Sequence, residues 1–265
     1  MKQITISCVT VGEPQTLECL DRLNKLTPYS FDLTVWYDTC GKGLDVNFLN
    51  ALHDRTDDII ISSKNRGPIS ENAFSVLYSD TPYVLIVSPD VMVTEKYYEK
   101  LMIPFNHNPK IGMVGEPAYD IYGLEAHKLN YLIGTVVEKR TGSVAVPDMA
   151  VMLKREAIND CGGISPSLKF YGYDYIELSG RMEAKGWSSA LVLGIIDRTK
   201  LSNSSIGSNT QLSELSYRNE LVMRQLKYKN FSGYDWWRND LMKNEEIYWE
   251  CLNVEKELEE LHVDS

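Results

Sequence analysis

The sequence lacks any long apolar run. Its unbroken apolar stretches, such as residues 83–87 and 190–193, fall far short of the roughly 18 residues that a membrane-spanning helix requires. The amino-terminal residues enter a strand-like alternation directly, without the apolar stretch and small-residue cleavage site of a signal peptide. We therefore expect a protein that stays in the cytosol and crosses no membrane.

Cysteines are few and form no motif. There are five of them, an odd number, and they are widely spaced, with no C-x-x-C pair. No histidine cluster lies nearby that could complete a zinc site. Reduced thiols are the expected state of these side chains.

Basic charge is in deficit, with 27 lysines and arginines against 37 aspartates and glutamates, a formal net charge of −10. Binding to a phosphate polymer depends on basic side chains that displace counterions, so nucleic acid is a weak candidate partner. A G-x-G-x-x-G segment is also missing after the first apolar stretch. Its absence argues against a dinucleotide-dependent dehydrogenase.

The 265 residues include 43% apolar and 24% charged side chains, which is enough for a substantial core. From residue 4 to about residue 193, β-rich apolar runs alternate with amphipathic stretches, as in a parallel sheet flanked by helices. The expected strands are residues 4–9, 33–37, 59–62, 83–88, 111–115, 149–153 and 190–196. We expect one helix to open at Pro14 and two others at residues 71–78 and 95–101.

Asp38 directly follows one expected strand and Asp90 lies just beyond the end of another, and ligands of such sheets bind beyond the carboxyl ends of the strands. Asp90 could hold Mg²⁺ or Mn²⁺ against a nucleotide diphosphate, since these ions prefer oxygen ligands. The alternative is a turn aspartate after Pro89. Asp38 could accept a hydrogen bond from a uracil ring nitrogen, and its alternative is the stabilisation of an Asx-turn.

A second acidic pair, Asp174 and Glu177, is spaced so that both carboxylates share one face if a helix begins near Asp174. Either could take the proton of an acceptor hydroxyl as a general base. In the alternative, Asp174 caps the helix and Glu177 pairs with Arg181. A polar loop at residues 65–72 leads into another helix and could place Arg66 near a phosphate.

In their order along the chain, these segments resemble the family 2 type glycosyltransferases of the nucleotide-diphospho-sugar transferase (GT-A) fold, over about residues 3–200. The nucleobase-contacting aspartate of that family is matched by Asp38, and its Asn-x-Gly-x-x-x-x-Asn loop by residues 65–72. Its metal-binding D-x-D is matched by residues 88–90. Its acceptor-side G-G-[FI]…[ED]-D segment is matched by residues 162–164 and Asp174.

The resemblance implies an α/β catalytic domain over residues 1–200 with a mixed, mostly parallel sheet. Its nucleotide-sugar-binding half would span about 1–115 and its acceptor-binding half about 116–200. Residues 201–265 would form a loop and a helical extension, whose last helix packs on the body or on a partner such as a second copy. The residues implied for the donor site are Thr10, Gly12, Glu13, Asp38, Asn65, Arg66, Gly67, Asn72, Ser88 and Asp90.

The implied activity is that of a hexosyl- or N-acetylhexosaminyltransferase with Mn²⁺ or Mg²⁺ as cofactor. It would move a sugar from a nucleoside diphosphate, expected to be UDP, to a hydroxyl acceptor such as a glycan or lipid-linked glycan. A protein or nucleic acid acceptor is a weaker candidate. The basic and aromatic residues at 217–238 could stack sugar rings, meet a lipid-phosphate surface or bind single-stranded nucleic acid. Their alternative is an amphipathic helix packed on the sheet.

The sequence departs from the family pattern at two positions. Ser88 stands where the D-x-D has its first acid, which predicts a weakened metal site. The late histidine of the family is missing, and Asp197 is its best substitute as a metal ligand, with an ion pair as the alternative role. Two alignments of the last motif both select Asp174, but they differ over Glu177 and over inversion or retention of the anomeric configuration.

Two other functions fit part of the pattern. The first is a catalytically inactive protein that still binds a sugar nucleotide, for which Ser88 is the motivating residue. The second is a nucleotidyltransferase, which would be expected to carry a glycine-rich, arginine-bearing first loop. Residues 10–14 do not form such a loop.

Overall fold

The computed structural model describes residues 2–63, 67–117, 132–133, 136–137, 144–145, 147–165, 168 and 172–200. The predictions for the loop at 202–209, the basic and aromatic segment at 217–238 and the last helix with its partner contact lie outside these residues. Asn65 and Arg66 lie outside them as well. Within the described part, no helix has the length and apolar character needed to span a membrane.

The described strands build one large sheet and one small ribbon. They are β1 Ile4–Thr10, β2 Phe31–Asp38, β3 Asp58–Ser62, β4 Tyr83–Val87, β5 Ile111–Glu116, β6 Leu132–Ile133, β7 Val136–Val137, β8 Val144–Ala145, β9 Met149–Lys154 and β10 Ser188–Leu191. The large sheet has eight strands in the order β3-β2-β1-β4-β9-β5-β10-β6, and β7 pairs with β8. Strands β1 to β4 run parallel, as do β5 and β10, whereas β9 runs antiparallel between β4 and β5. This confirms the predicted mixed, mostly parallel sheet.

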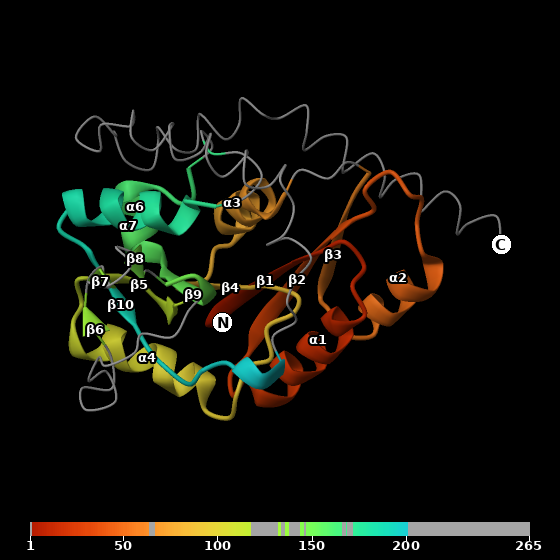
Figure 1. Cartoon of the computed structure of the whole chain (residues 1–265), viewed down its shortest axis with the longest axis horizontal. Coiled ribbons are helices and arrows are strands. Elements are labelled where there is room, and N and C mark those ends of the chain that lie inside the picture. The colour runs from red at the N-terminus through yellow and green to blue at the C-terminus, as the bar shows by residue number, and fades with distance from the viewer. Residues whose placement is uncertain are drawn as a thin grey trace.

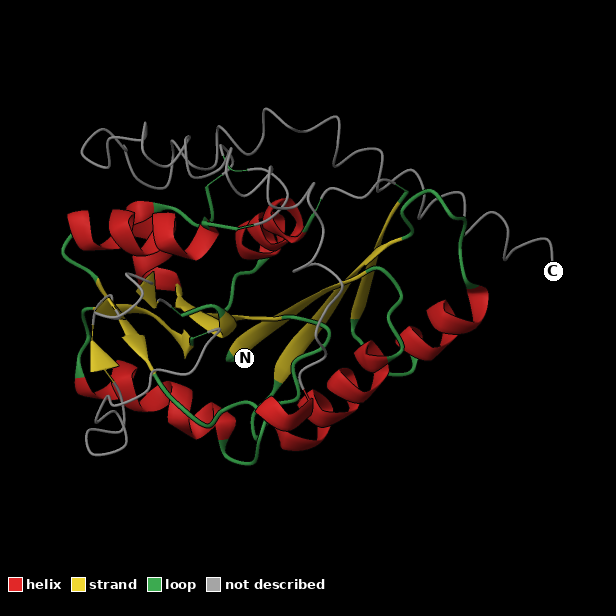
Figure 2. Ribbon diagram, viewed as in Figure 1, coloured by secondary structure: helices red, strands yellow, loops and turns green. Residues whose placement is uncertain are grey.

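Helices cover both faces of the sheet (Figures 1 and 2). The helices are α1 Gln15–Leu26, α2 Val46–His53, α3 Pro68–Tyr78, α4 Tyr97–His107, α6 Arg155–Cys161 and α7 Asp174–Ala184, and a 3-10 turn covers Arg198–Lys200. Helices α1, α2 and α4 lie on one face, and α3, α6 and α7 on the other (Figure 1). The arrangement is a three-layer α/β sandwich.

Each face of the sheet has its own hydrophobic core. Alternate residues of β1, Ile4 and Ile6 among them, pack with Leu20 of α1 and with residues of α2 and α4. On the opposite face, Trp36 of β2 and Val84 of β4 pack with residues of α3, α6 and α7. Because successive side chains of a strand point to opposite faces, a strand covered on both sides reads as one continuous apolar run.

The last strand is shorter than predicted. β10 ends at Leu191, whereas the apolar pattern predicted a strand to residue 196. Gly194 adopts a φ of 71°, which turns the chain, and Ile196 then makes an isolated antiparallel bridge with Val93. Helices α2 and α6 were not predicted, because eight and seven residues are too few to establish a helical period.

Candidate functional site

Parallel strands bring polar residues to one edge of the sheet. The carboxyl ends of β1, β2 and β5 are Thr10, Asp38 and Glu116, and the turn after β4 lies at the same edge. β9 runs the other way, so the residue before it, Asp148, also lies at this edge. Its backbone N–H donates to the Glu116 carbonyl at 3.1 Å. We call this the carboxyl edge.

The loop after β1 is held by its own side chains. The Glu13 carboxylate accepts from the Thr10 hydroxyl at 2.6 Å and from the Val11 N–H at 2.9 Å. Gly12 has a φ of 92°, a conformation that favours glycine, and a Cβ there would lie 3.5 Å from the Tyr37 ring. These contacts fix a tight loop at the carboxyl edge, where three of the residues expected to bind the donor lie together.

Asp38 is the last residue of β2 and its side chain is buried. Its Oδ1 accepts from the Cys40 N–H at 3.3 Å, which is the Asx-turn contact weighed from the sequence. The role of Asp38 at a nucleobase stays a prediction.

The polar loop before α3 is described from Gly67 onward. Gly67 has a φ of 74° and precedes Pro68, the first residue of α3. Asn72 lies on the buried side of that helix, and its Oδ1 has no hydrogen-bond partner among the described residues. The predicted phosphate contact of this loop is untested, since Arg66 lies outside the described residues.

The turn after β4 carries Ser88 and Asp90. It is closed by the Val91 N–H, which donates to the Ser88 carbonyl at 3.0 Å, and the Cys19 thiol reaches the same carbonyl at 3.8 Å. Ser88 is exposed and Asp90 is partly exposed. The Pro-Asp turn is therefore present, and a ligand can still reach the Asp90 carboxylate.

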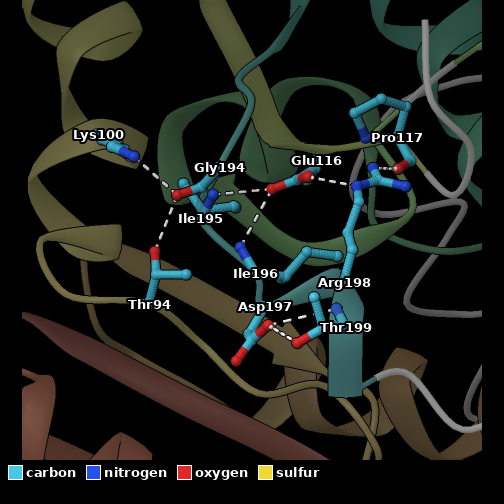
Figure 3. Close-up of polar contacts among 10 residues, drawn as sticks. All are labelled: Thr94, Lys100, Glu116, Pro117, Gly194, Ile195, Ile196, Asp197, Arg198 and Thr199. Atoms are coloured by element: carbon cyan, nitrogen blue, oxygen red, sulfur yellow. Dashed lines mark hydrogen bonds and ion pairs between the residues drawn. The ribbon is translucent and has the colours of Figure 1, made fainter.

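The segment after β10, residues 194–198, makes hydrogen bonds to neighbouring parts of the protein (Figure 3). The Gly194 carbonyl accepts from Lys100 Nζ at 2.7 Å and from the Thr94 hydroxyl at 2.8 Å. The Thr94 N–H donates to the Ile195 carbonyl at 2.9 Å, and the Asp197 N–H donates to the Met92 carbonyl at 2.7 Å. Residues 194–198 therefore lie beside the chain that follows Asp90.

Asp197, the predicted second metal ligand, is partly exposed on this segment. Its Oδ1 accepts from both the N–H and the hydroxyl of Thr199, while the other oxygen points away (Figure 3). The Thr199 contacts, aided by the charges of Arg22 and Lys200, lower the pKa of Asp197. The described residues contain no group of three or more His, Cys, Asp or Glu side chains that could hold a metal ion.

Glu177 and Arg181 form the predicted i,i+4 ion pair, and both side chains are completely buried. The Arg181 Nε and Nη2 donate to the two carboxylate oxygens at 2.8 and 2.6 Å. Arg181 also donates to the carbonyls of Cys161 and Gly163 at 2.7 and 2.6 Å. The pair thereby anchors the turn after α6 to α7.

Asp174 is the first residue of α7, so the condition set from the sequence, a helix that begins near Asp174, is met. Burial raises the pKa of Asp174 from its ordinary 3.8 to about 7, and repulsion from the Asp148 carboxylate adds to the rise. Backbone N–H groups of Asp174 and Tyr175 donate to the carboxylate and oppose this change with a smaller effect. Raised pKa values of this kind are common where a carboxyl group takes part in proton transfer.

Asp148 is a site residue that the sequence analysis missed. Protein atoms crowd around it closely enough to raise its pKa to about 6. The residue is nevertheless exposed to solvent, and its pKa is raised less than that of Asp174. Glu116 was missed as well, although it directly follows a predicted strand and the rule that selected Asp38 would have selected it.

No protein-family model and no curated protein matches the sequence. The mannosyltransferase PcManGT from Pyrobaculum calidifontis, solved with GDP-Man and Mn²⁺, is similar in structure. Its TM-score is 0.59 at 13% identity, over 100% of this chain and 76% of that chain. Glucosyl-3-phosphoglycerate synthase from Mycobacterium tuberculosis, solved with Mg²⁺ and UDP, has a TM-score of 0.60 at 14% identity, over 85% and 80% of the two chains.

GalNAc-T7, solved with UDP, GalNAc and Mn²⁺, has a TM-score of 0.52 at 12% identity, over 92% of this chain and 57% of that chain. At such identities the likeness concerns the fold alone. The chain has the GT-A fold of nucleotide-sugar glycosyltransferases, as the resemblance in sequence implied.

Proposed function

We propose that this protein is a glycosyltransferase that moves a sugar from a nucleoside diphosphate to a hydroxyl group of an acceptor. The observation that carries the proposal is the environment of Asp174. This carboxylate begins α7, interacts with the charge of Asp148 at the carboxyl edge, and has a pKa of about 7. A general base is most effective when its pKa lies near the working pH.

In the proposed reaction, the acceptor oxygen forms a bond to the anomeric carbon while the bond from that carbon to the diphosphate oxygen breaks. The acceptor proton passes to the Asp174 carboxylate, and the nucleoside diphosphate leaves with the electron pair of the broken bond. A direct displacement of this kind inverts the anomeric configuration. The configuration of the product is therefore a direct test of the role given to Asp174.

We propose that the nucleotide binds at the other end of the carboxyl edge. The loop of Thr10, Gly12 and Glu13 would contact it, and the buried Asp38 carboxylate would accept a hydrogen bond from the ring N–H of the base. Uracil and guanine each offer such an N–H, and PcManGT was solved with GDP-Man while the other two structures contain UDP. UDP is the nucleotide that we propose, with GDP as the comparison.

The two carboxylates proposed as metal ligands suit Mn²⁺ or Mg²⁺ in their chemistry. Asp90 and Asp197 are partly exposed oxygen donors, on segments joined by the bond from Asp197 to Met92. Mg²⁺ often takes only one or two carboxylates from a protein and completes its shell with phosphate oxygens and water. A cation held there would neutralise charge on the departing diphosphate.

We assign Glu177 a positioning role. Its carboxylate is completely buried against Arg181, so it would act by holding the turn at Gly162 and Gly163 in place. Removing one partner of a buried pair typically costs about 3–5 kcal/mol, because the other charge is left uncompensated. A loss of activity in a Glu177 variant would then accompany a loss of stability.

The test compares the wild-type protein with the Asp174→Asn and Glu183→Gln variants. Glu183 is exposed on the same helix and serves as the matched control. With UDP- and GDP-sugars, Mn²⁺ and a panel of hydroxyl acceptors, Asp174→Asn should lower the transfer rate about 10²–10⁴-fold. Its affinity for UDP should stay unchanged, and Glu183→Gln should behave as wild type. Undiminished transfer by Asp174→Asn would exclude Asp174 as the base.

A second candidate is a binding protein that keeps the fold and has lost the reaction. The observation in its favour is Ser88, which leaves Asp90 as the one acid of its D-x-D segment. The same assays separate the two functions. Calorimetric binding of UDP without release of sugar from any donor would support the binding protein, whereas turnover that depends on Asp174 would eliminate it.

A further inference from the structure

The carboxylate of Glu116 accepts hydrogen bonds from three residues of the segment that follows β10 (Figure 3). Its side chain is 2% exposed. Oε2 accepts from the backbone N–H groups of Ile195 and Ile196 at 2.8 and 3.1 Å. Oε1 accepts from Arg198 Nε at 2.9 Å, and Arg198 Nη2 donates to the Pro117 carbonyl at 2.6 Å.

These contacts hold the residues immediately before and after Asp197 in the sequence. Ile195 and Ile196 precede it and Arg198 follows it, and all three are bound to Glu116. A buried backbone N–H without an acceptor is costly, so the conformation of this segment depends on the Glu116 carboxylate. The backbone N–H of Asp197 donates to the Met92 carbonyl. None of the bonds to Glu116 involves the Asp197 carboxylate.

We propose that Glu116 is a positioning residue that sets the place of Asp197 and, through it, the affinity of the donor site for a divalent cation. The proposal rests on the proposed function, in which Asp197 is a metal ligand. Mutation of a residue that hydrogen-bonds to a metal ligand and orients it typically lowers metal affinity about 10–100-fold. Glu116 touches neither the donor nor the acceptor in this scheme and acts only through residues 195–198.

Glu116→Gln is the informative substitution. Glutamine keeps the shape and can still accept from the backbone N–H groups, but its amide NH₂ would face the Arg198 donor, and two donors cannot bond to each other. The matched control is Glu99→Gln, the same chemical change at an exposed position on α4. Arg198→Lys is the second variant, because it removes the Nε donor to Glu116 and the Nη2 donor to Pro117 without altering the net charge.

The experiment uses the full chain and measures Mn²⁺ affinity in the presence of saturating UDP, from the electron paramagnetic resonance signal of free Mn²⁺. Glu116→Gln and Arg198→Lys should each weaken the affinity about 10–100-fold. Glu99→Gln should leave it unchanged. Thermal unfolding in EDTA reports separately whether each variant is folded before metal is added.

A double-mutant cycle with Asp197→Asn decides how Glu116 acts. In the Asp197→Asn background, Glu116→Gln and Arg198→Lys should cost no more than about a further twofold, since the ligand they position is already lost. Equal losses in both backgrounds, or no loss in either variant, overturn the proposal.

The same data separate this proposal from the proposed function. Suppose that the wild-type protein binds UDP and Mn²⁺ and that Asp197→Asn binds Mn²⁺ equally well. The positioning role of Glu116 is then wrong, and the proposed donor site stands. If the wild-type protein binds neither UDP nor Mn²⁺, the donor site itself is wrong, and the role of Glu116 falls with it.

Discussion

Two aspartates from different parts of the chain share one electrostatic environment at the carboxyl edge. Burial is the larger cause of the raised pKa of Asp174, and the charge of Asp148 is the second. A nearby like charge disfavours ionisation, so the Asp148 carboxylate adds to the rise in the pKa of Asp174. In the proposed reaction, an acceptor hydroxyl at neutral pH would therefore meet an Asp174 carboxyl group that is only partly ionised.

The pH profile of transfer should report the ionisation of Asp174. Since Asp174 must be ionised to take a proton, kcat/KM should rise with pH through about 7. Asp148→Asn removes the like charge, so the rise should move to a pH between the ordinary 3.8 and about 7. The measurement is kcat/KM against pH for the two proteins at constant ionic strength.

Asp80→Asn is the control for this shift. Asp80 is exposed and lies before β4, at the opposite edge of the sheet, so its variant should keep the wild-type profile. If the Asp148→Asn profile coincides with that of wild type, or moves to higher pH, Asp148 does not act on the base.

The difference between Asp38 and Asp148 shows what could be predicted about single residues. Asp38 follows an apolar run, and the rule that ligands bind beyond the carboxyl ends of strands selected it from the sequence. Asp148 precedes its strand and lies at the same edge because β9 runs antiparallel. An apolar run does not encode its direction in the sheet, so this residue could not be selected in advance.

Among the elements, α7 begins with Asp174 and packs on the sheet beside α6. The distance of both helices from the sheet depends on Gly112 of β5. A Cβ at this position would lie 2.6 Å from the Cβ of Ala157 on α6 and 3.2 Å from the sulfur of Met182 on α7. The first distance is too short for two carbon atoms. The glycine therefore lets both helices pack closely on β5.

Gly112→Ala should destabilise the protein by about 1–3 kcal/mol, the usual cost of overpacking a core. Urea denaturation measures the change. The matched variant is Gly112→Ala with Ala157→Gly, which removes the other half of the clash. Its loss should be smaller than the sum of the two single losses by about 0.5–3 kcal/mol, as expected for residues in contact. Additive losses would mean that α6 moves away from β5 freely.

At this scale, long elements with strong signals were predicted well and short ones were not. α1 begins directly after Pro14, where the sequence predicted a helix to open, and its Leu20 and Leu23 are buried. Residues 192–196 carry the apolar pattern of a strand, but the backbone of residues 194–196 bonds to the Glu116 carboxylate and to Thr94. Such long-range bonds leave no mark in a local pattern.

For the whole molecule, the predicted halves at about 1–115 and 116–200 contribute to one continuous sheet. β9 belongs to the second half and lies between β4 and β5, both of which lie almost entirely in the first. The order of strands along the chain therefore differs from their order in the sheet. Sequence patterns reveal the first order but carry little information about the second.

A chain that ends at residue 115 should consequently fail to fold. Without β9, the facing edges of β4 and β5 have no strand between them, and unpaired edges of apolar strands are prone to aggregate. Size-exclusion chromatography and circular dichroism of the truncated chain, beside the full-length protein, provide the test. A soluble monomer with cooperative unfolding would show that the first half is an independent unit.

The position of β9 also limits how this protein can move. Asp38 and Asp90 follow strands on one side of β9, Asp148 precedes β9 itself, and the segment with Asp197 follows a strand on its other side. A hinge between donor and acceptor sides would have to break the hydrogen bonds of β9 with β4 or β5. Any opening and closing during the proposed reaction would then be carried by loops beyond the carboxyl edge, while the sheet beneath them stays rigid.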